Sequence, residues 1–128
     1  MVSKDLADLL HAKIPMLVFG QNMFTGREPS TPDNTVTLFD TSGSSTNTID
    51  PQASHKTASV QVRVRNNDYL VAMQLIEQII DALHLVSNME LNGIYYLLIT
   101  HLSGPGLLEW DGNNRVKLIA NFETQLRK

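Results

Sequence analysis

The chain has 128 residues, of which 42% are hydrophobic, and it carries a formal net charge of −3. This length suits one ordinary hydrophobic core, so we expect a single domain over residues 1–128. The absence of cysteine excludes disulfide bonds, thiolate metal sites and a cysteine nucleophile. The negative charge argues against general affinity for nucleic acid, although it leaves a local basic face open.

The first predicted element is a short helix that begins at Ser3 and ends before Pro15, whose ring disfavours continued helix. Leu6, Leu9 and Leu10 give this helix an apolar face, which we expect to cover one edge of the core. The N-terminus lacks the apolar core and cleavage site of a signal peptide. No run approaches the roughly 20 apolar residues that cross a bilayer, so we expect no membrane partner.

The next segments are less regular. Residues 16–19 form an apolar run that suits either a strand or a packed loop, and residues 21–34 are rich in turn-forming residues. Alternation predicts a strand at residues 35–40. Residues 41–57 form a polar run whose one large aliphatic residue is Ile49. Because such a run cannot build a core, we expect a long loop there, either flexible or ordered on assembly.

The centre of the fold is predicted at residues 59–65, where three valines alternate with polar residues that include Arg63 and Arg65. This strand has one apolar face and one basic face. Asp68 and the two asparagines before it offer N-cap side chains, so a helix should begin at Tyr69. Its apolar residues recur at spacings of three and four over about nineteen residues, enough to cross the whole sheet. These residues are Tyr69, Ala72, Met73, Ile76, Ile79, Ile80 and Leu83.

The strongest hairpin signal lies in residues 90–102, because Asn92 and Gly93 suit the positive φ angles of a type I′ turn. A long apolar strand follows from Ile94. Its continuous hydrophobicity indicates burial on both faces, either as a central strand or under another subunit. We expect the glycines and proline at residues 104–106 to end this strand.

Leu107, Leu108 and Trp110 are then predicted in a loop closed by residues 111–114. Three large apolar residues between turn signals either fold back as a lid on the core or stay exposed as an anchor for a partner. Residues 115–127 alternate apolar and polar side chains and predict a last long strand. Together the elements predict an α+β fold: a mostly antiparallel sheet of about four strands, with one long helix packed across a face and a short N-terminal helix.

Nothing in the sequence points to catalysis, a cofactor or a metal. The four histidines lie far apart outside any ligand spacing, and no pair of carboxylates stands out as acid and base. Arg63 and Arg65, with the basic residues of the last strand, could contact phosphate if the strands are neighbours. The competing interpretation, which we favour, is a sheet face that is solvated or salt-bridged between subunits.

Four segments carry a resemblance to a known family. They are PDNTVTLFDT from residue 32, SVQVRVRNNDYLVAMQLIEQIIDAL from residue 59, NGIYYLLI from residue 92 and NRVKLIANFETQLR from residue 114. In this order and spacing they resemble the tailed-phage minor capsid and tail terminator family, also called tail completion or head-tail joining proteins. The resemblance covers nearly the whole chain.

The resemblance implies a non-enzymatic subunit that forms a ring, typically a homohexamer, which caps the tail tube and docks it to the neck of the capsid. The implied partners are other copies of the chain, the major tail tube protein and the head-tail connector or stopper protein. Non-specific passage of double-stranded DNA through the lumen stays open. The implied location is the tail-neck junction of the virion, after assembly in the cytoplasm of the host bacterium. The interface candidates are Leu107, Leu108, Trp110, Arg63, Arg65 and Ile49.

Two other classes of function compete with this one. A small α+β ligand-binding or enzyme-accessory domain would use the sheet face away from the long helix as a pocket wall. A nucleic-acid-binding module would use the arginine strand and show a steep salt dependence. Neighbouring head and tail genes would separate these classes most simply.

Overall fold

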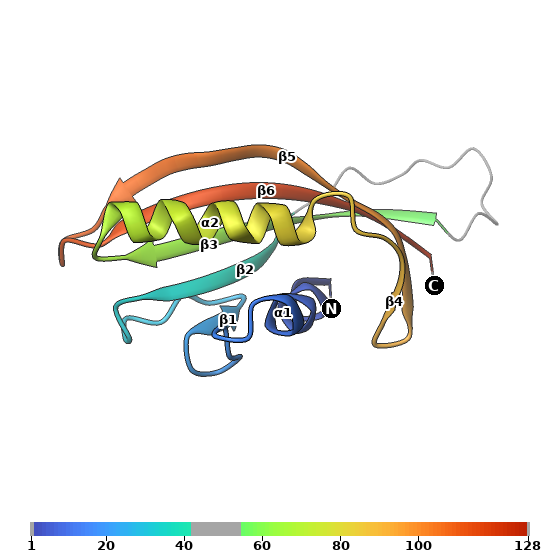
Figure 1. Ribbon diagram of the computed structural model, residues 1–128, viewed down its shortest axis with the longest axis horizontal. Helices are drawn as coiled ribbons and strands as arrows, with labels where there is room; N and C mark the ends of the chain where they lie inside the picture. Colours follow the sequence, from blue (N-terminus) through green and yellow to red (C-terminus); the bar gives the residue numbers. More distant parts are fainter. Residues whose placement is uncertain (1, 42–54, 128) are drawn as a thin grey trace.

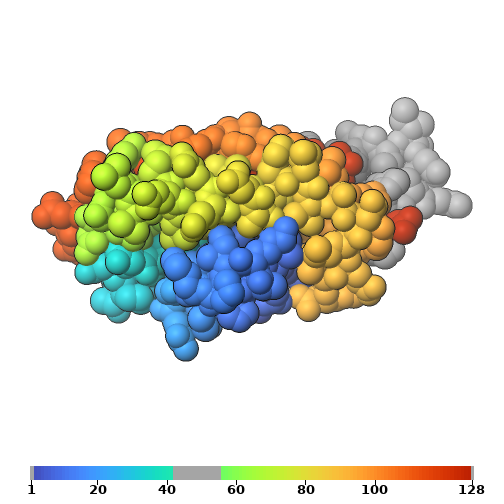
Figure 2. Space-filling view, in the orientation of Figure 1, coloured from blue at the N-terminus to red at the C-terminus, as the bar shows by residue number. Residues whose placement is uncertain are grey.

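A computed structural model describes residues 2–41 and 55–127 and shows two helices covering one face of a curved sheet (Figure 1). The elements in chain order are α1 (Val2–Lys13), β1 (Met23–Thr25), β2 (Thr35–Thr41), β3 (His55–Asn66), α2 (Tyr69–Leu83), β4 (Ser87–Leu91), β5 (Ile94–Trp110) and β6 (Val116–Arg127). In the space-filling view, α1 and α2 lie side by side and the β4–β5 hairpin continues the same surface (Figure 2). The α+β class is confirmed.

The sheet has six strands in the order β1-β2-β3-β6-β5-β4, rather than about four. Every neighbouring pair is antiparallel except β1 and β2, which run parallel with Met23 opposite Val36. The extra edge strand β1 has only three residues and lies inside the segment that was predicted as turns. Its pairing is non-local, so the local turn residues gave no sign of it.

The core lies between α2 and the three central strands. Val60, Val62 and Val64 of β3 stand opposite Phe122, Ala120 and Leu118 of β6, and all six side chains are fully buried. Partners that face each other across an antiparallel pair share one face of the sheet. The predicted alternation of both strands is therefore confirmed, and its apolar face is the face under α2.

Helix α2 begins where the sequence predicts and ends earlier. The Asp68 carboxylate accepts a hydrogen bond from the Leu70 backbone N–H at 2.9 Å, which satisfies a donor that the first turn leaves unpaired. The helix has 15 residues instead of about nineteen, because the chain turns at Leu85, where φ is 64°. The predicted apolar face was wrong at two positions: Tyr69 is exposed, and Leu75, which the prediction omitted, is buried.

Helix α1 is fixed by polar contacts at its first turn as well as by its leucines. Ser3 lies inside the helix, and its backbone N–H and its hydroxyl both donate to the Asp40 carboxylate, so it does not act as the predicted start. The buried Asp5 carboxylate accepts a hydrogen bond from the Tyr96 hydroxyl at 2.5 Å. Burial and the Asp5 carboxylate raise the pKa of Tyr96, so this phenol stays a donor.

The predicted hairpin is confirmed, with φ of 52° at Asn92 and 84° at Gly93 joining β4 to β5. The predicted end of the following strand was wrong. β5 continues through residues 104–106 to Trp110, with a shift of its register against β6 between Ser103 and Gly106. Such a shift is a β-bulge, which bends a strand without ending it.

The predicted polar loop is shorter than residues 41–57, since Thr41 ends β2 and β3 begins at His55. The middle of that loop, including the candidate Ile49, lies outside the described residues. Residues 16–19 form a packed loop and not one of the strands of the sheet. Leu17 is buried there, and Phe19 forms an isolated β-bridge with Met23.

Candidate functional site

The most conspicuous surface feature is the apolar β5 edge, formed by Leu107, Leu108 and Trp110. These side chains are 56%, 43% and 52% exposed. They were predicted in a loop, and the structure places them at the C-terminal end of strand β5. Large exposed apolar residues that lie together mark interaction surfaces. Of the two predicted alternatives, this exposure does not fit a lid on the core, and an anchor for a partner stays a prediction.

The strand edge beside these residues carries no partner within the described part of the chain. β4 pairs with β5 only as far as Leu98, and backbone bonds from residues 85 and 86 extend this contact to Ile99. The stretch from Thr100 to Trp110 is therefore paired with β6 alone. An open strand edge with apolar side chains is a template for association with another chain.

The apolar β5 edge points to the helical side of the sheet. Leu107 stands opposite Leu118, and Trp110 stands opposite Val116, and both partners face α2. β5 also contacts the end of this helix, where Nδ1 of the C-cap residue His84 accepts a hydrogen bond from the His101 backbone N–H at 3.1 Å. The exposed side chains thus border the helix layer rather than the opposite face.

On the opposite face, a buried Glu28 cluster replaces the predicted basic surface. The Glu28 carboxylate lies 2.8 Å from Lys117 Nζ, 3.7 Å from Arg65 and 3.9 Å from Arg63. Arg65 is only 2% exposed, and its guanidinium also donates to the backbone oxygens of Pro32 and Asp33. The segment before β2 is thereby tied across β3 and β6.

The Glu28 cluster corrects the prediction for Arg63 and Arg65. Their side chains do not form an outward basic strip, because Arg65 is buried and Arg63 is only partly exposed. Burial, followed by the charge of Arg115, lowers the pKa of Arg65, while the hydrogen bond with Glu28 raises the pKa of Lys117. These cations pair with Glu28 within the subunit, so a phosphate-binding strand is not supported.

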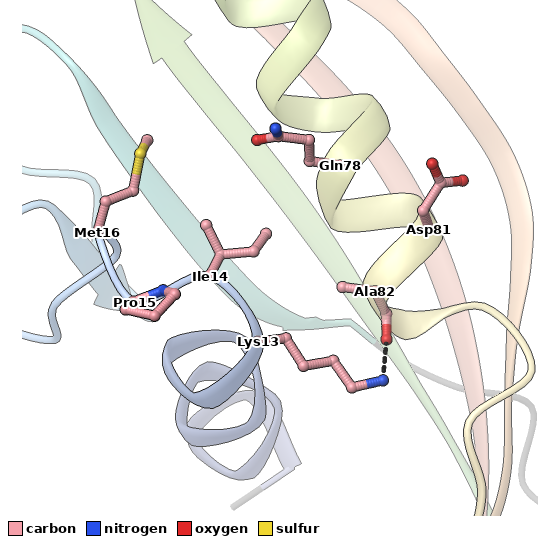
Figure 3. Close-up of a pocket in the computed structure, with 7 residues that line it drawn as sticks. All are labelled: Lys13, Ile14, Pro15, Met16, Gln78, Asp81 and Ala82. Atoms are coloured by element: carbon pink, nitrogen blue, oxygen red, sulfur yellow. Dashed lines mark hydrogen bonds between the residues drawn. The ribbon is translucent and has the colours of Figure 1, made fainter.

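Two hollows lie on the other side of α2 from the β5 edge. The α1–α2 groove, of about 660 Å³, runs between the end of α1 and α2, and Lys13 Nζ donates to the Ala82 oxygen across it at 2.8 Å (Figure 3). The β2–α2 pocket, of about 200 Å³, lies deeper between α2 and the start of β2. Met16 lines both hollows and is itself 60% exposed.

Comparison with known protein families identifies the family of this chain. The model of the bacteriophage tail terminator protein family matches residues 11–128. The chain belongs to the bacteriophage tail terminator family. Membership makes it a structural protein of the virion tail, which confirms the resemblance of its sequence segments.

Solved structures share the tail terminator's fold at low sequence identity. A chain in the structure titled "Virion of native gene transfer agent (GTA) particle" is 13% identical, with a TM-score of 0.65 over 96% of this chain and 84% of that one. A second solved chain is 14% identical, with a TM-score of 0.59 over 99% of this chain and 91% of that one. No curated protein matches the sequence.

A structural role agrees with the chemistry that the described residues offer. No group of three histidine or acidic side chains among residues 2–41 and 55–127 is placed to hold a metal ion. Neither helix in these ranges has the length and apolar character needed to cross a bilayer. Both hollows border α2, whereas the ligand-binding alternative placed its pocket wall on the sheet face away from that helix.

Sequence reasoning singled out some of these side chains, Arg63 and Arg65 among them, and missed others. Leu107, Leu108 and Trp110 were found because large apolar residues between turn signals are conspicuous. Glu28 was missed, since a single acid in a turn-rich segment gives no sign of three cations from distant strands. The β2–α2 pocket was missed because its lining comes from five separate stretches of the chain.

Proposed function

We propose that this tail terminator forms a closed ring, a homohexamer, that ends the tail tube and joins the tail to the head connector. The observation that carries the proposal is the apolar β5 edge on a strand with no outer partner in the described chain. A subunit of a family of structural tail proteins needs a surface that meets another protein, and this surface has the required exposure and character.

Ring closure requires two different patches that meet head to tail, since a self-complementary patch would stop at a dimer. The β5 edge provides the first patch, and the side of the molecule with the α1–α2 groove provides a different one. The partners beyond the ring are then the major tail tube protein on one side and the connector or stopper protein on the other. The fold shared with a chain of a gene transfer agent virion supports a place within a virion.

The charge distribution suits passage of double-stranded DNA through the lumen rather than tight binding. The net charge is −3, and the arginines of β3 are held in the Glu28 cluster. Non-specific DNA binding depends on cations that are free to neutralise phosphates. We accordingly place the subunit at the tail-neck junction, with assembly in the host bacterial cytoplasm.

Removing the gene from an infecting phage is expected to yield filled heads and separate tails, some of irregular length, because nothing ends the tube or joins it to the neck. Electron microscopy of the lysate measures this outcome. Expression of the protein from a plasmid should restore joined particles. Normal joined virions in the absence of the protein would contradict the proposed function.

Light scattering on the purified protein, alone or mixed with tail tubes, is expected to show a multimer with the mass of six subunits. Assembly is linked to concentration and to the template, so the tube can stabilise a ring that the free protein forms weakly. The tube without added protein is the control. A monomer under both conditions would contradict the ring.

A further inference from the structure

The chain carries an exposed anchor on one edge and an apolar pocket on the opposite edge. The anchor is Trp110, the largest side chain of the apolar β5 edge. The pocket is the β2–α2 pocket, whose apolar walls include Leu17, Val36, Val71 and Leu75. Its volume of about 200 Å³ suits one large side chain rather than a peptide or a drug-sized ligand.

The two features are placed for contact between neighbouring copies. Both lie on the helical side of the sheet, because Trp110 faces the α2 layer and the pocket is bounded by α2 itself. Both lie at the end of the molecule where α2 begins and β5 ends (Figure 1). β5 and β2 lie on opposite sides of the central pair β3 and β6, so one copy can present Trp110 to the pocket of a neighbour placed beside it.

The pocket has polar groups beside its apolar walls. Its lining contains no carboxylate, so Glu109 and Asp111, which flank Trp110, would meet no like charge there. Asparagines 22, 34 and 66 add side-chain amides to the lining; each amide oxygen already accepts one backbone N–H and has a second lone pair for the indole N–H. A buried tryptophan needs such an acceptor for its N–H group.

A contact through side chains is favoured over addition of a strand. Pro105 lacks a backbone donor, and β5 changes register against β6 three times between His101 and Glu109. Bulges and proline on an edge strand oppose continuous pairing with another chain. At the other edge of the sheet, β1 offers only three residues. Backbone pairing between the two edges would therefore be short and broken.

We infer that the ring interface is made by Trp110 of one subunit inserted into the β2–α2 pocket of the next. This inference rests on the proposed ring and names the two surfaces that close it. Fully desolvated tryptophans in pockets at the centre of an interface dominate binding energy. The contact is heterologous, so every subunit gives one anchor and receives one.

A mixing experiment tests the directed contact. Trp110→Ala removes the anchor, and Val71→Glu places a charge in the pocket lining while the anchor stays intact. At a protein concentration where the wild-type ring forms, alone or on tail tubes, each variant should associate about 30-fold more weakly. An equimolar mixture should give one-to-one dimers, because the anchor of Val71→Glu can enter the pocket of Trp110→Ala. Wild-type association by either variant, or a mixture no better than its components, would overturn the inference.

Cross-linking gives a second, independent readout, since the chain has no cysteine of its own. Gly112→Cys protein, which keeps Trp110 and places a thiol two residues from it, should be joined to Met16→Cys protein by a short bis-maleimide, because Met16 lines the pocket. Gly112→Cys mixed with Gln125→Cys, exposed on a different surface, should not be joined. Equal yields in both mixtures, or no product from an assembled ring, would overturn the contact while leaving the ring intact. Failure of the wild-type protein to assemble under any condition would instead refute the proposed function, and with it this contact.

The two variants must be folded for these outcomes to count. Trp110 is half exposed, so Trp110→Ala should leave the melting temperature of the isolated subunit within about 2 °C of wild type. A clear fall in the melting temperature would show that Trp110 packs on its own subunit, which contradicts its role as an anchor. Rescue of dimer formation in the mixture would not occur if either variant were unfolded.

Discussion

Replacing Glu28 with alanine is expected to lower the free energy of unfolding by about 3–5 kcal/mol, because three mostly buried cations each lose a carboxylate partner. The Glu28 side chain is only 9% exposed and lies against Arg63, Arg65 and Lys117. When one partner of a buried ion pair is removed, the remaining charge is still desolvated but loses the attraction that offset this cost. Urea denaturation followed by circular dichroism measures the change.

The matched control for Glu28 is Glu109→Ala, which removes the other carboxylate that pairs with Lys117. Glu109 lies 3.3 Å from Lys117 Nζ, but its side chain is 54% exposed. Exposed ion pairs contribute about 0–1 kcal/mol, so this variant should unfold almost like wild type. Equal effects of the two substitutions would show that the Glu28 cluster does not hold the segment before β2 to the sheet.

Gly104→Ala is expected to destabilise the subunit by roughly 2–5 kcal/mol, through backbone strain and overpacking together. Gly104 has φ of 98°, and an added Cβ would lie 2.5 Å from the backbone oxygen of Ile119 and 2.8 Å from the Cα of Ala120. Both atoms belong to the backbone of the neighbouring strand, so a change of side-chain rotamer cannot relieve the clash. Thermal denaturation of the isolated variant measures the loss.

Gly106→Ala is the control for this position, two residues further along the same bulged strand. An added Cβ there meets only a side-chain atom of Ile119 at 4.0 Å, which is an ordinary contact. We expect a change within about 0.5 kcal/mol, as for a surface substitution without special features. A large effect of both substitutions would indicate that β5 tolerates no side chain in this stretch, whatever its backbone angle.

The elements that sequence predicts well are those whose pattern is local. α2, β6 and the Asn92–Gly93 hairpin follow from periodicity and turn chemistry within a few residues, and all three are present. β1 could not be predicted, because three residues become a strand only by pairing with β2. Gly104 was misread as a strand end, since a glycine in a bulge and a glycine in a turn look the same in sequence.

The same distinction between local patterns and long-range contacts holds for the candidate site. Alternation correctly placed Arg65 on the face away from the valines, but alternation cannot tell what covers that face. The segment before β2 covers it, and the covering contacts reach across 32 positions of sequence, from Asp33 to Arg65. The exposure of Trp110 likewise depends on where β5 lies in the sheet order, which no local pattern fixes.

The length of β5 has a mechanical consequence. It pairs with β6 from Tyr95 to Trp110, with four shifts of register, so the hairpin end and the anchor end are joined through one pair of strands. A force that pulls Trp110 along the strand direction is shared among many backbone hydrogen bonds at once, because those bonds stand perpendicular to the pull. The subunit can therefore carry tension through its edge while the helices, which sit on the face of the sheet, stay unloaded.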